Sequence, residues 1–194
     1  MSFYAIAGII AGIVQACSII PYIQEMIHGE VRPNVVSWIL WTLIQLIIIA
    51  AQFAAGASWS VVIPIVMTFG TCLVLILCLF GYGYTRYGLV DGICLILAIC
   101  AIIIWQLIND PVLAILISIV ADLTAGIPTY VKAYREPFTE SLLAWSLLII
   151  ANTLALIAAH PFNTANVAFP LYVSVVDVIF ISLLVMRRRT LRRA

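Results

Sequence analysis

Six polar side chains interrupt long apolar stretches of the sequence, where an amide or a carboxyl group needs a specific reason to be present. They are Gln15, Gln45, Gln52, Asp122, Asn152 and Asp177. Such groups are costly in lipid, so they face a protein interior or a water-filled cavity and mark substrate or proton pathways. Amides and carboxylates can bind a small polar solute, and a carboxylate can also carry a proton. The sequence therefore predicts a polar site inside an apolar protein.

Two of these residues belong to matching stripes of small or polar side chains. The stripes have the same spacing of four, three and four positions: Ala11, Gln15, Ser18 and Tyr22 in the first, and Ser118, Asp122, Ala125 and Thr129 in the second. This spacing places each set on one face of a helix. Two interpretations are open, namely the lining of a pocket and close packing of helices through small residues.

Each half of the sequence also pairs a tryptophan with an amide. Trp38 precedes Gln45 by two helical turns, and Trp145 precedes Asn152 by the same interval, so each pair shares one helical face. An indole ring can stack on the apolar face of a small solute while the amide donates and accepts hydrogen bonds. The alternative is that both tryptophans belong to an interfacial belt, since each lies near an expected helix end.

The elements that must position these residues are membrane-spanning helices. Hydrophobic residues make up 65% of the 194 residues and charged residues 9%, against about 25% charged in a soluble domain, so a water-facing surface could not be covered. Seven continuous apolar segments approach the roughly 20 residues that a spanning helix needs. They are residues 4–27, 34–55, 59–81, 88–108, 111–133, 139–160 and 167–187. We therefore expect an all-α membrane protein with seven transmembrane helices.

The basic residues indicate how these helices are oriented. All nine Lys and Arg residues fall at the same end of the expected helices: Arg32, Arg86, Lys132, Arg135, Arg187, Arg188, Arg189, Arg192 and Arg193. The positive-inside rule makes this end cytoplasmic. The N-terminus is then outside and the C-terminus inside, in a plasma membrane or a bacterial inner membrane. Nine basic against eight acidic residues leave no basic face for a nucleic acid.

The sequence also indicates an internal repeat, and chance similarity between two stretches rich in Leu and Ile is the alternative interpretation. Sliding the chain along itself until Pro21 meets Pro128 also brings Trp38 onto Trp145, and a single-position gap then places Thr71 opposite Asp177. We call this superposition the repeat alignment. One intervening helix gives both triplets the same orientation, which is typical of a parallel repeat. The expected parts are a first triple-helix unit at 1–81, a linker helix at 82–110, a second unit at 111–187 and a basic cytoplasmic tail at 188–194.

Two segments carry the repeat most clearly, SIIPYIQEMIHGEVRPNVVSWILW and AGIPTYVKAYREPFTESLLAWSLL. In each, a proline late in one helix precedes a short loop and a tryptophan-bearing helix. With the 3+1+3 topology, these segments resemble the SWEET sugar transporters and their PQ-loop (MtN3-like) relatives. The chain departs from that family at its Pro-Gln dipeptide, which is Pro21-Tyr22 and Pro128-Thr129 here.

The resemblance implies an alternating-access transporter for a sugar or another small neutral polar metabolite, with hinges at Pro21 and Pro128 that move an inner gate. Static kinks are the other interpretation of these prolines. The residues expected to bind substrate are Gln15, Trp38, Gln45, Thr71, Asp122, Trp145, Asn152 and Asp177. Proton coupling through Asp122 or Asp177 is a further expectation, since protonation would remove the charge as the site changes sides.

A non-transporting membrane receptor or scaffold is the alternative function, because a fold does not define an activity. A receptor for a carboxylate would need a basic pocket, and no Lys or Arg lies deep within the expected helices, so transport is favoured. His28 and His160 fall on opposite membrane faces, and no HExxH, P-loop or CxxC motif is present. We therefore expect no enzymatic activity, metal or cofactor. The expected partners are a small-molecule substrate and the lipid bilayer, and a homo-oligomer is compatible with the sequence.

Overall fold

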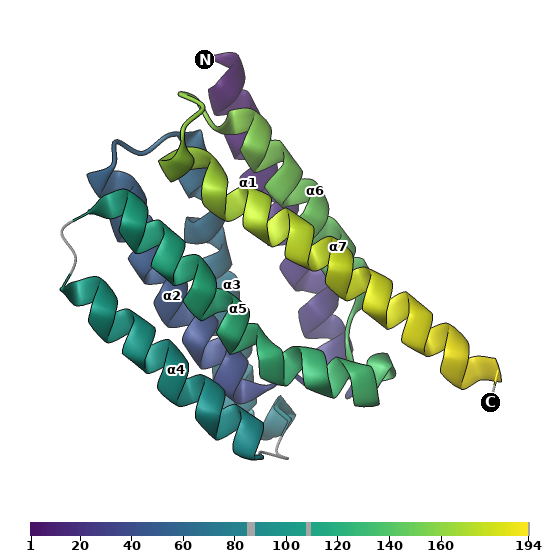
Figure 1. Cartoon of the computed structure of the whole chain (residues 1–194). Coiled ribbons are helices and arrows are strands. Elements are labelled where there is room, and N and C mark those ends of the chain that lie inside the picture. Colours follow the sequence, from purple (N-terminus) through teal and green to yellow (C-terminus); the bar gives the residue numbers. More distant parts are fainter. Residues whose placement is uncertain (85–87, 108–109, 194) are drawn as a thin grey trace.

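The computed structural model describes residues 1–84, 88–107 and 110–193, and this part of the chain contains seven α-helices and no β-strand (Figure 1). The helices are α1 (Phe3–Ile27), α2 (Val35–Ala54), α3 (Val62–Leu77), α4 (Leu89–Gln106), α5 (Pro111–Arg135), α6 (Leu142–Ala158) and α7 (Thr164–Arg193). Short helical turns at Trp59–Val61, Cys78–Tyr82 and Pro137–Thr139 extend or connect them. The prediction of an all-helical chain with seven helices is confirmed.

Five of the helical segments are long and apolar enough to cross a membrane. They are Phe3–Ile27, Val35–Ala54, Trp59–Tyr82, Pro111–Arg135 and Thr164–Arg192. Helix α6 is also apolar but has 17 residues. The structure therefore has the composition and helix lengths of a multi-pass membrane protein.

Several helix ends differ from the sequence-based prediction, among them the start of the seventh helix, which is Thr164 rather than 167. The sixth helix begins at Leu142 rather than at 139, because Pro137–Thr139 forms a separate turn and the Ser141 side chain caps the helix by accepting from the Ala144 amide. Residues 188 to 193 continue α7 as its last turns. Arg187 donates to the carbonyl of Tyr134, near the end of α5, and Arg188 donates to the carbonyl of Pro137 in the α5–α6 connection.

The helices pack as two triplets, which we call the first triplet (α1–α3) and the second triplet (α5–α7). In the first triplet α3 packs against both α1 and α2, and in the second α7 packs against both α5 and α6. Between the triplets, α1 packs on α6 and α2 packs on α5. Helix α4 lies at the edge of the bundle against α5 (Figure 1).

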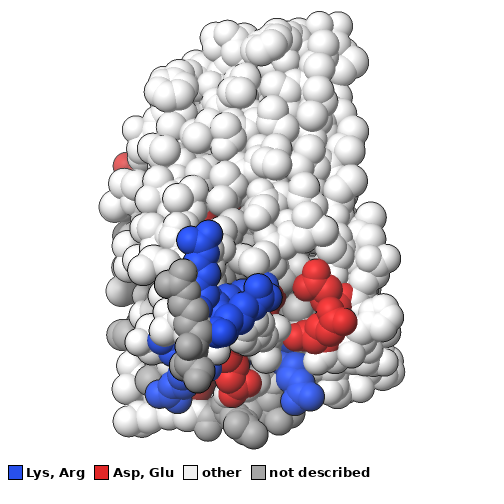
Figure 2. Space-filling view, turned by 90° about the vertical axis from the view of Figure 1, so that its right-hand side faces the viewer, with Lys and Arg blue, Asp and Glu red and all other residues white. Residues whose placement is uncertain are grey.

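The basic side chains lie at one end of this bundle, which we call the basic end. On the face shown in Figure 2, Lys and Arg gather in the lower part of the molecule, near several acidic side chains. Contacts place Arg32 beside Thr139, and Arg187 beside Tyr134. Arg86 lies outside the described residues. At the opposite end the rings of Tyr4 and His160 stack with their centroids 4.2 Å apart.

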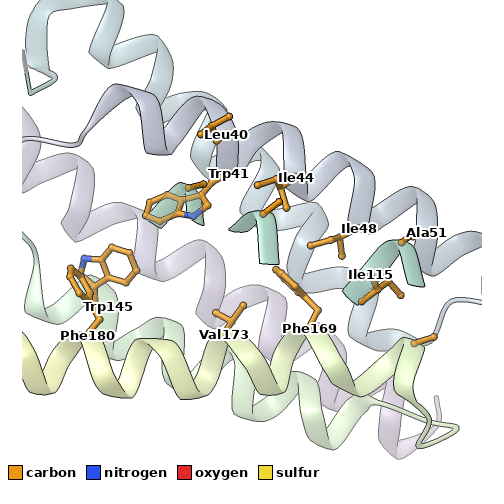
Figure 3. Packing of buried hydrophobic residues seen from close by; sticks show 14 of the residues in the cluster. Leu40, Trp41, Ile44, Ile48, Ala51, Ile115, Trp145, Phe169, Val173 and Phe180 are labelled. Atoms are coloured by element: carbon orange, nitrogen blue, oxygen red, sulfur yellow. The ribbon is translucent and has the colours of Figure 1, made fainter. Parts of the chain in front are cut away.

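Apolar packing fills the half of the bundle away from the basic end. Ile44 and Ile48 of α2, Ile115 of α5 and Phe169 of α7 are fully buried in one cluster (Figure 3). Helix α1 approaches the turn at Trp59–Val61 closely at Gly8. A side chain is not tolerated there, since a Cβ would lie 2.8 Å from the backbone oxygen of Trp59. Apolar side chains therefore fill much of this half of the bundle, and the cavity described below lies nearer the basic end.

Candidate functional site

A cavity lies between the two triplets, and α1, α2, α3, α5, α6 and α7 all contribute to its lining. It holds about 80 Å³ that the centres of water molecules can reach, which is room for several waters. Six of the eight residues that the sequence predicted as substrate-binding line it. They are Gln15, Trp38, Thr71, Asp122, Trp145 and Asp177.

Gln45 and Asn152 do not line the cavity, although both are buried. Each lies two helical turns beyond its tryptophan, which is about 10 Å further along the helix and toward the packed half of the bundle. The Asn152 amide instead donates to the carbonyl of Leu148 in its own helix, at 2.9 Å. Of each predicted pair of ring and amide, only the ring therefore lines this cavity, and the amide lies two helical turns further along its helix.

The two carboxyl groups of the cavity come from neighbouring helices of the second triplet. Asp122 of α5 accepts a hydrogen bond from the Tyr172 hydroxyl at 3.0 Å, and its backbone carbonyl accepts from the indole N–H of Trp41 at 3.3 Å. Asp177 of α7 is 3% exposed, and its Oδ2 has no hydrogen-bond partner among the described residues. Oε1 of Gln15, across the cavity in α1, is likewise buried without such a partner.

Unsatisfied buried acceptors are uncommon in folded proteins, and each costs about 1–3 kcal/mol unless water or a ligand satisfies it. Here such acceptors on Gln15 and Asp177 line one cavity, and the Tyr22 hydroxyl and the Trp38 indole N–H in its lining also lack a partner among the described residues. The arrangement is suited to a guest that forms hydrogen bonds.

A continuous chain of aromatic rings runs beside these polar groups. We call it the aromatic chain, and in order of contact its members are Tyr22, Trp38, Trp41, Trp145, Phe180 and Tyr130. Successive ring centroids lie between 4.6 and 6.1 Å apart. Trp41 and Trp145 form the step that joins the two triplets, and both rings are labelled in Figure 3. All members except Phe180 line the cavity.

Sequence reasoning missed three aromatic residues of the lining, Trp41, Tyr130 and Tyr172. The repeat alignment selected Trp38 because its counterpart is also a tryptophan, whereas the counterpart of Trp41 is Leu148, which lines the cavity as well. The available signal for Tyr172 was a hydroxyl-bearing ring well inside an apolar segment.

The basic end of the cavity is bordered by a buried polar network, which we call the Lys132–Glu140 network. The Lys132 ammonium of α5 pairs with the Glu140 carboxylate and donates to the carbonyls of Arg32 and Thr139. The other Glu140 oxygen accepts from the indole N–H of Trp145 at 3.0 Å. The network thus ties the α1–α2 connection to the α5–α6 connection and to the aromatic chain.

Two further sets of bonds strengthen this end. Arg188 of α7 donates to the carbonyls of Pro137 and Glu140, and the Ser141 hydroxyl donates to the Glu25 carboxylate of α1 at 2.9 Å. Helices α1 and α5 both continue without interruption past their internal prolines, Pro21 and Pro128. The residues next to these prolines therefore stay helical.

No protein-family model, curated protein or solved structure matches the chain. Within the described residues, no group of three or more His, Cys, Asp or Glu side chains could hold a metal ion. The fold and the site define a class: a bundle of seven α-helices, apolar enough to enter a membrane, around a cavity lined by aromatic rings and two carboxyl groups.

Proposed function

We propose that the protein is a small-solute membrane transporter that works by alternating access around this cavity. The observation that carries the proposal is that six helices, three from each triplet, contribute to one cavity with unsatisfied polar groups. Helix α5 runs from Pro111 to Arg135, so Asp122 lies near the middle of a helix that can span the membrane. Secondary transporters hold substrate at such a depth, between two repeats.

The proposal includes a 3+1+3 arrangement in which the triplets are parallel repeats and α4 is the linker. Three observations support it. The third helix of each triplet packs against the other two, and the contacts of α1 with α6 and of α2 with α5 exchange under the repeat. The caps of α2 and α6, Asn34 and Ser141, coincide in the repeat alignment, and each accepts from the amide three positions further along the chain.

A reciprocal pair of contacts at the basic end also supports the repeat. Glu25 and Lys132 coincide in the repeat alignment, and each reaches the connection that belongs to the other triplet. Glu25 accepts from Ser141, and Lys132 donates to the carbonyl of Arg32. In our proposal the basic end is cytoplasmic, by the positive-inside rule, and these contacts form an inner gate in its closed state.

Opening this gate would require the two connections to separate. We assign the hinges to Pro21 and Pro128, because a proline inside a helix lacks one backbone hydrogen bond and bends more easily. Coupling to protons through Asp122 or Asp177 belongs to the same proposal. A plasma membrane or bacterial inner membrane is the proposed location.

Uptake into proteoliposomes tests the function. The purified chain is reconstituted and offered labelled sugars, amino acids, vitamins and amines, with empty liposomes as the control. We expect saturable uptake of at least one solute. We also expect loss of that uptake in Trp41→Ala, which removes the ring that contacts Trp145 between the two triplets. Folded protein that takes up no solute of the panel would overturn the proposal and favour a receptor or scaffold.

A further inference from the structure

The ionisable Asp, Glu, Lys, Arg and His side chains in the described lining of the cavity are all acidic. Two carboxyl groups, Asp122 and Asp177, line it, and no Lys, Arg or His side chain does so among the described residues. The basic group of the bordering network, Lys132, is 3% exposed and already engaged by Glu140 and two backbone carbonyls. Two carboxyl groups buried without a basic partner are costly as anions, so a bound positive charge would stabilise them.

The hydrogen-bonding groups of the lining are compatible with a cation. Five donors in the lining are engaged with acceptors of the protein: the hydroxyls of Ser18, Thr71 and Tyr172 and the indole N–H groups of Trp41 and Trp145. Oδ2 of Asp177 and Oε1 of Gln15 are acceptors without a partner among the described residues. A protonated amine only donates hydrogen bonds, so its N–H groups can satisfy both of these oxygens. A quaternary ammonium group has no N–H, and the carboxyl groups would attract it by charge alone.

The aromatic chain adds a second element of cation recognition. Three of its indoles, those of Trp38, Trp41 and Trp145, line the cavity together with the rings of Tyr22 and Tyr130. A cation is attracted to the face of an aromatic ring, most strongly to tryptophan, and desolvation strengthens the attraction. The Trp38 N–H and the Tyr22 hydroxyl, on neighbouring rings, lack a partner among the described residues. Both groups are neutral, so neither carries a charge that repels a cation.

We infer that the cavity binds a small organic cation, an amine or a quaternary ammonium compound without a carboxylate, between the aromatic chain and the carboxyl groups of Asp122 and Asp177. The inference rests on the proposed transport function for its biological meaning, and it replaces the neutral polar metabolite predicted from the sequence with a cation. A zwitterion is disfavoured, because its carboxylate would find no basic side chain in the described lining. The modest volume of the cavity excludes bulky cations.

Binding to purified protein in lipid nanodiscs tests the inference without transport. The probes are choline, tetramethylammonium and propylammonium, each compared with 3,3-dimethylbutan-1-ol, the uncharged isostere of choline. The readouts are the intrinsic tryptophan fluorescence and the shift in melting temperature. We expect at least one cation to bind about tenfold or more tightly than the isostere, which corresponds to about 1.4 kcal/mol.

Two variants connect this discrimination to the cavity. Asp177→Asn should reduce the preference for the cation by about tenfold. Glu30→Gln, which removes an exposed carboxylate from the α1–α2 connection, should leave the preference unchanged. If Asp177→Asn fails to fold, the comparison of cation and isostere on the unmodified protein still tests whether the protein prefers a cation.

The outcomes separate the two proposals. The inference is overturned if none of the three cations binds more tightly than the uncharged isostere, even if the liposomes take up a neutral solute and transport itself stands. Cation binding that Asp177→Asn weakens, without uptake of any solute, supports the site and overturns transport.

Discussion

Lys132 of α5 and Glu140, the residue just before the cap of α6, form an ion pair whose side chains are 2% and 0% exposed. The pair joins several parts of the basic end, since it also holds the carbonyl of Arg32 and the indole of Trp145. Removing one partner of a buried pair leaves an uncompensated charge, which is more damaging than replacing both partners.

Lys132→Met should therefore lower the free energy of unfolding by about 3–5 kcal/mol, measured by denaturant titration in detergent. The double variant Lys132→Met/Glu140→Met should be less destabilised than Lys132→Met, because no charge is then left buried. Arg189→Gln, at an exposed position of α7, serves as the control. A double variant no more stable than the single one would show that the charges themselves do not account for the effect.

Trp145 should respond to substitution differently from Trp38. The Trp145 indole donates to Glu140, so Trp145→Phe keeps a ring in the aromatic chain but leaves a buried carboxylate oxygen without its donor. We expect a loss of about 1–3 kcal/mol in stability, and a larger loss of uptake than in Trp38→Phe. Thermal unfolding and uptake, measured on both variants, check this. Identical behaviour of the two would mean that only the ring matters at Trp145.

The topology can be tested with single cysteines in a cysteine-free background. Cysteines at Glu30 and Phe138, both exposed at the basic end, should react with a membrane-impermeant maleimide only after the cells are opened. A cysteine at Phe162, exposed in the α6–α7 connection, should react in intact cells. Labelling of Glu30→Cys or Phe138→Cys from outside would contradict the N-out, C-in orientation and the repeat proposed with it.

Protons and a cationic solute should compete at the carboxyl groups. Protonation removes the negative charge that the solute needs, so uptake should fall as the external pH is lowered. Asp122→Asn should abolish this pH dependence while leaving the protein folded, since an amide can still accept from Tyr172. The check is uptake across a range of pH with thermal unfolding as the folding control. An unchanged profile in Asp122→Asn would move the proton site to Asp177, and an unchanged profile in both variants would exclude coupling through this pair.

The two internal prolines should affect rate more than binding. Pro21→Ala and Pro128→Ala allow a backbone hydrogen bond that proline cannot make, which stiffens α1 and α5. We expect uptake to slow several-fold while ligand affinity is retained. Pro64→Ala, near the start of α3, is the matched control. Unchanged uptake in both hinge variants would show that the prolines are static kinks.

The helices were predicted from the sequence better than the site was. Helix positions follow from the length of the apolar segments, because a bilayer requires about 20 such residues. The errors lie at helix ends, where a capping side chain such as that of Ser141 determines at which residue the helix begins. The site depends on which helices meet, which a periodic pattern does not encode. Gln15 and Asp122 were found from helical stripes, whereas Trp41 was missed because its importance lies in the contact with Trp145 on another helix. Glu140 was missed because it lies in a connection between helices, where a carboxylate in the sequence does not indicate a buried site.

The carboxyl groups of the cavity are unevenly divided between the two triplets. Asp122 and Asp177 both belong to the second, and the positions that match them in the first are Gln15 and Thr71. Two identical chains could not produce this, since their symmetry would place a carboxyl group at all of these positions. If the triplets are repeats within one polypeptide, as proposed, they can differ at these positions. In the proposed transport cycle, the second triplet would then keep both carboxyl groups beside the ligand while the first triplet moves.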